Sequence, residues 1–198
     1  MAGPCVAVLL PDPWTASHVE LFRVWLAEAL TNQTGDWWLL REPSRLGWQA
    51  ESPVTGPMLV EPDDWDVEDP DEAAFLARAA GFRPATEVVL ASATNGVDDH
   101  RFLAHLAVAI AHRYGGLIDL TGPLPVPPPA RVRVLDAVEA GTGIEEWWAG
   151  SRETLRMLGG AWHEIPYVAA GGTRHIYHVV EPDLLTVWLT HPQFRMVK

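Results

Sequence analysis

The amino-acid sequence predicts an α/β fold, with α+β as the alternative, in which helices pack on a single mixed sheet. Residues 87–122 form an apolar strand, a helix and a second apolar strand, the order typical of a βαβ unit. Residues 4–41 repeat this order near the N-terminus. A chain of 198 residues with 48% hydrophobic content suits one globular domain spanning residues 1–198.

The first unit starts with the apolar strand 4–10. The following stretch predicts a helix because apolar side chains recur there at helical spacing: Val19, Phe22 and Leu26. We expect the polar residues 31–35 to form a loop and residues 36–41 to form the second strand. Together these elements would make one βαβ unit.

The central unit, residues 87–122, contains a helix that we expect to run from about Asp98 to Tyr114. Either Asp98 or Asp99 is a suitable N-cap, because a carboxylate can accept hydrogen bonds from the first free amides. Two glycines at 115–116 end the helix, and a short, nearly all-apolar strand follows.

The C-terminal part begins with residues 123–129, which contain five prolines. Proline cannot join the interior of a sheet, so this segment is predicted to be a stiff connector on the surface. Beyond it we expect a helix at 144–158, a hairpin made of strands 162–169 and 174–180, and a short final helix at 182–190.

Acidity is the clearest functional signal. The net charge is −12, and eight of the 26 Asp and Glu residues lie between Glu61 and Glu72 with no basic residue among them. An acidic surface disfavours direct binding to nucleic acid or to an anionic membrane, which both require basic groups. The sequence therefore predicts a basic protein partner.

Tryptophan is the second signal, with ten in the chain. The adjacent pairs 37–38 and 147–148 cannot both face one side of an element, so one of each pair is expected at the rim. Trp65 lies inside the acidic run, either as an exposed anchor for a partner or as a tether packed against the body. The candidate partner-binding residues are Asp63, Asp64, Trp65, Asp66, Glu68 and Asp69.

An enzyme of undetermined reaction is the alternative function. Its pocket would lie at the C-terminal ends of the central strands, where α/β enzymes often place functional groups. A subunit of a larger assembly is a further alternative, and the sequence leaves the oligomeric state open. The candidate pocket residues are Ser92, Asn95, Asp98 and Asp119.

Several kinds of site are disfavoured by the pattern of residues. Cys5 is the only cysteine, which excludes an intramolecular disulfide and a thiolate zinc site. Histidines at metal-binding helical spacing and glycine-rich phosphate loops are both missing, so we expect no metal and no cofactor. The sequence has no apolar run long enough for a membrane helix, and we expect a cytoplasmic protein.

Two segments carry a resemblance to a known group of proteins. They are Gly115-Gly116-Leu117-Ile118-Asp119, after a histidine-containing helix, and the C-terminal His191-Pro192-Gln193-Phe194-Arg195-Met196-Val197-Lys198. In these segments the chain resembles small uncharacterised proteins of GC-rich bacteria, similar to immunity proteins of polymorphic toxin systems. The resemblance implies a cytoplasmic, non-enzymatic binder that neutralises a toxin, and it transfers no catalytic residue.

Overall fold

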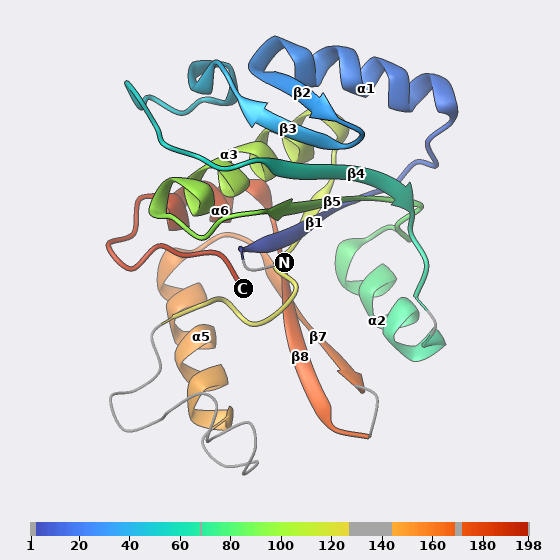
Figure 1. The fold of residues 1–198 in the computed structure, drawn as a ribbon. Helices are drawn as coiled ribbons and strands as arrows, with labels where there is room; N and C mark the ends of the chain where they lie inside the picture. The colour runs from blue at the N-terminus through green and yellow to red at the C-terminus, as the bar shows by residue number, and fades with distance from the viewer. Residues whose placement is uncertain (1–2, 68, 127–143, 169–171, 198) are drawn as a thin grey trace.

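The computed structural model describes residues 3–67, 69–126, 144–168 and 172–197 (Figure 1). Its elements are β1 (Cys5–Leu10), α1 (Ala16–Ala29), β2 (Leu30–Thr34), β3 (Trp37–Leu40), the 3₁₀ turn η1 (Pro43–Leu46), β4 (Met58–Asp64), α2 (Pro70–Ala80), β5 (Thr86–Ser92), α3 (Val97–Tyr114), β6 (Leu117–Asp119), α5 (Ile144–Leu158), β7 (Trp162–Val168), β8 (Arg174–Val180) and α6 (Pro182–Leu189).

The strands form one eight-stranded sheet in the order β2-β3-β4-β5-β1-β6-β8-β7. The α/β class, the single sheet and the C-terminal hairpin of β7 and β8 are therefore confirmed. The sheet is not mixed at the level of neighbouring strands, because every pairing in the described part of the chain is antiparallel.

The predicted unit at 87–122 exists in a split form. β5 and β6 both pair antiparallel with β1, so they run parallel to each other with β1 between them. The helix α3 connects them and packs against the main core. β1 thus lies between two strands that would be direct neighbours in a simple βαβ unit.

The prediction of a βαβ unit at residues 4–41 is wrong in its second half. α1 ends at Ala29, and the chain continues directly into β2, where a loop was expected. Gly35, with φ of 56°, then turns the chain back into β3, and the Asn32 amide donates a 2.8 Å hydrogen bond to its carbonyl oxygen. β3 consequently runs antiparallel to β1. The polar sequence of β2 hid it because this strand lies at the edge of the sheet, mostly exposed.

Helices cover the two faces of the sheet unequally. α1, α3, α5 and α6 all contribute to the main core on one face, through residues such as Phe22, Phe102, Leu155 and Trp188. The other face is covered by α2, whose Leu76 packs with Leu9, Ile165, Tyr177 and Val179. Figure 1 shows α2 standing apart from the other helices. Glu87, Val89 and Asp119, which share this second face, are half-buried.

The proline-rich connector differs from the prediction in its described half. Residues 127–129 lie outside the described residues, but Leu124 is fully buried and Val126 nearly so. The Trp147 indole donates a 3.1 Å hydrogen bond to the Val126 carbonyl oxygen. This part of the segment is thus packed into the body of the protein, where a surface connector was expected.

Candidate functional site

The acidic segment begins as a strand. β4 continues beyond its buried residues into Glu61, Pro62, Asp63 and Asp64, which still pair with β5 but turn carboxylates outward. α2 then begins at Pro70, where Asp69 accepts a 2.9 Å hydrogen bond from the backbone N–H of Asp71. Negative charge at this end of a helix is favourable because the helix dipole is positive there.

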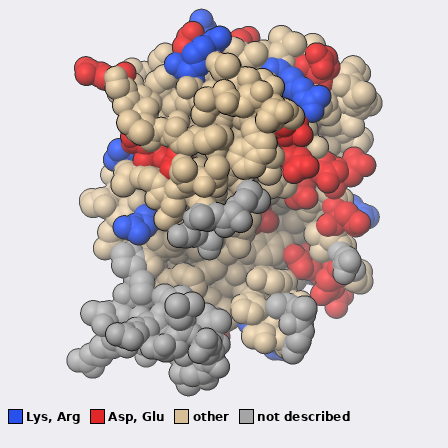
Figure 2. Space-filling view, in the orientation of Figure 1, with Lys and Arg blue, Asp and Glu red and all other residues tan. Residues whose placement is uncertain are grey.

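The second face of the sheet gathers carboxylates from four elements. Asp63 lies opposite Glu87 across β4 and β5, Asp119 ends β6, and Glu72 lies in the first turn of α2. Figure 2 shows acidic side chains along the right-hand side of the molecule, where Figure 1 places α2 and the end of β4. We call this surface the acidic face and define it by Asp63, Glu72, Glu87 and Asp119.

The environment of the acidic face raises the pKa values of three of its four carboxyl groups. Burial raises the pKa of Glu87, and the charge of Asp63 raises it further. Burial also raises the pKa of Glu72, against a hydrogen bond from Tyr177 that lowers it. Burial raises the pKa of Asp119 to about 7, with Glu87 and Glu72 adding to the shift. The carboxylates therefore repel one another across the boundary between strands and helix.

Two tyrosines lie beside these carboxylates. The Tyr177 hydroxyl donates a 3.0 Å hydrogen bond to Glu72, which links β8 to α2. Burial, reinforced by Asp119 and Glu72, raises the pKa of Tyr177, and burial with the same two charges raises that of Tyr167. Both phenols consequently stay neutral at physiological pH, and Tyr177 keeps the proton that it donates to Glu72.

Asp119 is held by an unusual turn. Its carboxylate accepts a 2.7 Å hydrogen bond from the backbone N–H of Thr121, whose φ of 58° lies in the left-handed region. A β-branched residue in that region carries backbone strain. The Cys5 thiol lies 3.4 Å from the Thr121 hydroxyl, so the only cysteine is also part of this corner.

The structure places the predicted partner-binding residues in different environments. Asp63, Asp64 and Asp66 are exposed, whereas Asp69 caps α2. Trp65 is partly buried and packs against the smaller core, the arrangement expected of a tether. Glu68 lies outside the described residues. The prediction for the tryptophan pairs is confirmed, since Trp38 and Trp148 are buried while their neighbours remain partly exposed.

The four predicted pocket residues do not converge. Buried Ser92 accepts a hydrogen bond from the Thr94 backbone N–H, and Asn95 is bonded to His100. Asp98 accepts a hydrogen bond from the Val54 N–H, and Asp119 belongs to the acidic face. Of these four residues, only Asn95 lines the cavity of about 1020 Å³ beside the first turn of α3.

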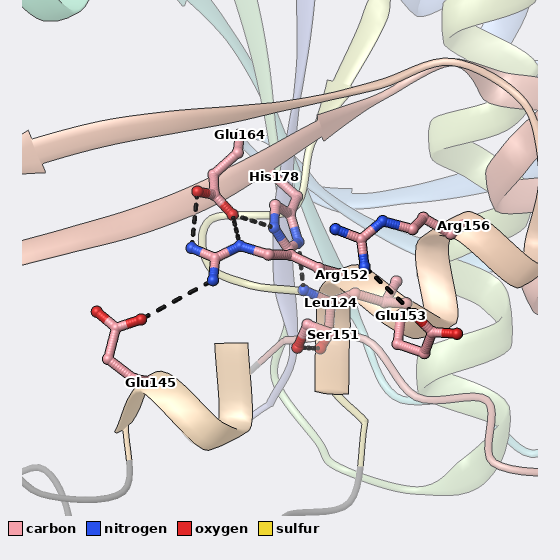
Figure 3. Close-up of polar contacts among 8 residues, drawn as sticks. All are labelled: Leu124, Glu145, Ser151, Arg152, Glu153, Arg156, Glu164 and His178. Atoms are coloured by element: carbon pink, nitrogen blue, oxygen red, sulfur yellow. Dashed lines mark hydrogen bonds and ion pairs between the residues drawn. The ribbon is translucent and has the colours of Figure 1, made fainter. Parts of the chain in front are cut away.

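A partly buried polar network on the main-core side was not predicted from sequence (Figure 3). Arg152 of α5 donates hydrogen bonds of 2.6 and 2.9 Å to Glu164 of β7, and Glu164 lies 3.5 Å from Nε2 of His178. Nδ1 of His178 accepts a 2.9 Å hydrogen bond from the Leu124 backbone N–H, and the Ser151 hydroxyl donates to the Leu124 carbonyl.

This network has a structural role. Because Nδ1 accepts from a backbone amide, the neutral His178 ring carries its proton on Nε2, facing Glu164. Burial lowers the pKa of His178 to about 4 despite the nearby carboxylate. Arg152 in turn holds the pKa of Glu164 below its usual value. A signal was available in the sequence, since Glu164 and His178 lie opposite each other when the two predicted strands pair as a hairpin.

The described residues contain no group of three or more His, Cys, Asp and Glu side chains arranged to hold a metal ion. Within the same residues, every helix is either too short or too polar to cross a membrane.

Comparison with known proteins gives one family. The matching family model covers residues 2–198 and is described as a family of unknown function (DUF6368). No curated protein and no solved structure matches the chain. Because the family model spans nearly all of the sequence, the chain belongs to the DUF6368 family.

Proposed function

We propose that this protein is a non-enzymatic protein-binding protein whose acidic face receives a basic surface of its partner. One observation carries the proposal. None of the nine ion pairs among the described residues involves a carboxylate of the acidic face or of the exposed run from Glu61 to Asp66. Carboxylates elsewhere, such as Asp36 and Glu164, are paired with arginine.

The carboxylates of the acidic face have no basic partner among the described ion pairs and repel one another, which lowers the stability of the isolated protein. Asp63 and Glu87 are directly opposed, and the pKa values of three of its four carboxyl groups are raised. Arginine or lysine side chains from a partner would relieve that repulsion at short range. At longer range the same charges would accelerate association, an effect that weakens as salt increases.

In its specific form, the proposal is that the partner is a basic toxin and that the acidic face covers its positively charged cleft. Charge complementarity supports this form, because a cleft that binds a polyanion is lined by basic side chains. Occupation by a protein carboxylate surface would exclude the toxin's substrate by direct competition.

The test begins with capture of partners from the native host, followed by measurement of affinity with the purified partner. The acidic variant combines Asp63→Asn, Asp64→Asn, Asp66→Asn and Glu68→Gln. A control variant removes charge from exposed carboxylates elsewhere: Glu51→Gln, Glu153→Gln and Glu181→Gln.

We expect the acidic variant to lose at least about ten-fold in affinity and much of its salt dependence, while the control variant binds like the natural protein. Equal affinity of the acidic variant and the natural protein would refute the proposal. Light scattering of the isolated protein tests the remaining alternative, a subunit of a larger assembly.

A further inference from the structure

Helix α1 exposes apolar side chains that the fold does not use. Phe22 and Leu26 face the main core, whereas Leu21 and Val24 are 65% and 60% exposed. A groove of about 650 Å³ runs beside these two side chains, and Trp14, Trp25 and Tyr114 form its aromatic wall. An aromatic wall next to exposed aliphatic side chains is typical of a surface that receives a partner's apolar anchor.

The aromatic wall is firmly packed. The rings of Trp14 and Tyr114 lie 4.9 Å apart at 63°, and those of Trp25 and Tyr114 lie 6.3 Å apart at 88°. The Arg113 guanidinium lies 5.3 Å from the Trp25 ring, within cation–π range. The Trp14 backbone N–H donates a 2.9 Å hydrogen bond to Thr86 of β5. Such a wall is organised before any partner arrives, which reduces the entropy lost on binding.

Trp14 connects this groove to the acidic segment. A second, smaller cavity of about 150 Å³ lies on its other side, against Pro62, Asp63 and Asp64. The groove itself is flanked by two carboxylates, Asp12 and Glu28. Arg113 also lines the groove, where its guanidinium lies over the Trp25 ring. Carboxylates therefore outnumber arginine along the groove by two to one, and further carboxylates follow at Asp63 and Asp64 of β4.

We propose that the α1 groove and the adjoining end of β4, with Asp63 and Asp64, form one docking surface and that its occupant is a basic amphipathic segment of a protein partner. An apolar side of this segment rests on Leu21, Val24 and Trp25. Its lysine or arginine side chains meet the flanking carboxylates and reach Asp63 and Asp64. This inference rests on the proposed function, and it adds the kind of partner segment and the residues that hold it.

The probe for the test is a synthetic peptide of leucine and lysine arranged as an amphipathic helix. A second peptide has the same composition in scrambled order, so that its leucines do not share one face. A third replaces lysine with glutamate. Binding is measured by Trp fluorescence and calorimetry for the natural protein, for Leu21→Ser with Val24→Ser, and for the control Val187→Ser, an exposed position on α6.

We expect the amphipathic basic peptide to bind at least about ten-fold more tightly than its scrambled form, and the α1 variant to remove that difference. The acidic variant should bind both basic peptides more weakly than the natural protein does, and the glutamate peptide should not bind. Equal binding of the two basic peptides overturns this inference but leaves the proposed function in place.

The remaining outcomes are equally decisive. If neither basic peptide binds, the inference fails, whereas the proposed function is decided separately by the affinity of the acidic variant for the captured partner. If the natural protein is a dimer that the α1 variant converts to a monomer, the groove is covered by a second copy and the inference is overturned.

Discussion

Asp63 of β4 and Glu87 of β5 are directly opposite each other in an antiparallel register, with like charges facing on the same side of the sheet. Such a pair destabilises a sheet by a few tenths of a kcal/mol to about 1 kcal/mol. Fold stability alone would favour a different residue at either position. A surface that binds basic groups gives a reason for both carboxylates to be present.

The first prediction concerns this pair. Asp63→Asn should raise the free energy of unfolding by a few tenths of a kcal/mol to about 1 kcal/mol, measured by urea denaturation at neutral pH. Asparagine can still accept the 2.8 Å hydrogen bond from the Asp64 backbone N–H, so the local turn is kept. The matched control is Asp36→Asn, which removes an ion pair with Arg23 and should not stabilise the fold. A destabilising effect of Asp63→Asn would contradict the prediction.

The second prediction concerns the pH dependence of stability through Asp119. Its pKa is raised from 3.8 to about 7 in the folded state. The folded protein therefore binds more protons than the unfolded chain between these values. The stability contributed by this group is fully present below the unfolded pKa and is lost as pH rises through 7.

Asp119→Asn should consequently gain stability relative to the natural protein as pH rises from about 4 to 8. The measurement is the urea midpoint of both proteins across this range, and the difference between the two profiles isolates the group. Parallel profiles would show that the Asp119 carboxyl titrates at its ordinary pKa.

The third prediction concerns His178, where the sign is opposite. Its pKa is lowered from 6.5 to about 4, so the unfolded chain binds the additional proton. Its contribution is present above pH 6.5 and is lost as pH falls towards 4, with a total of about 3 kcal/mol. His178→Asn keeps an acceptor for the Leu124 N–H and should flatten the acid side of the stability profile. An unchanged acid slope in this variant would rule out the prediction.

The fourth prediction concerns the contact between Arg152 and Glu164. Glu164→Gln removes the negative charge that accepts two hydrogen bonds from Arg152, and both side chains are only 27% exposed. The substitution should therefore lower the free energy of unfolding by about 1–3 kcal/mol. On the same helix, Glu153 makes a 3.2 Å contact with Arg156, but both side chains are more than 60% exposed. Glu153→Gln should therefore cost less than about 0.5 kcal/mol. Thermal unfolding of the two variants tests the contrast, and equal losses would count against it.

The spacing of apolar residues within each element made the core strands and helices predictable. The strand ending at Leu10 and the helix ending at Tyr114 have clear apolar patterns, and both occur as expected. β2 was missed because only Leu30 of its five residues is buried, so an edge strand of this kind leaves no alternating pattern. The antiparallel order was also hidden, since one sequence pattern is compatible with a parallel neighbour or with an inserted β1.

The acidic face was predictable only in part. The run from Glu61 to Glu72 is visible in the sequence, and so is the isolated carboxylate Asp119. Their common surface was not visible, because it depends on β5 and β6 lying on either side of β1. Nothing in the sequence marks Glu87 as part of this surface, for the same reason. Its significance comes from its cross-strand neighbour.

The position of β1 also has a consequence for how the chain is made. Val8 pairs with Val88 on one side and with Ile118 on the other, so β1 is synthesised well before either of its neighbours. At translation rates of about 5–20 residues per second, that delay lasts for several seconds. During this time an apolar segment with two unpaired edges must avoid other nascent chains. Completion of the sheet therefore requires β1 to stay free of other chains until residues 86–119 have emerged.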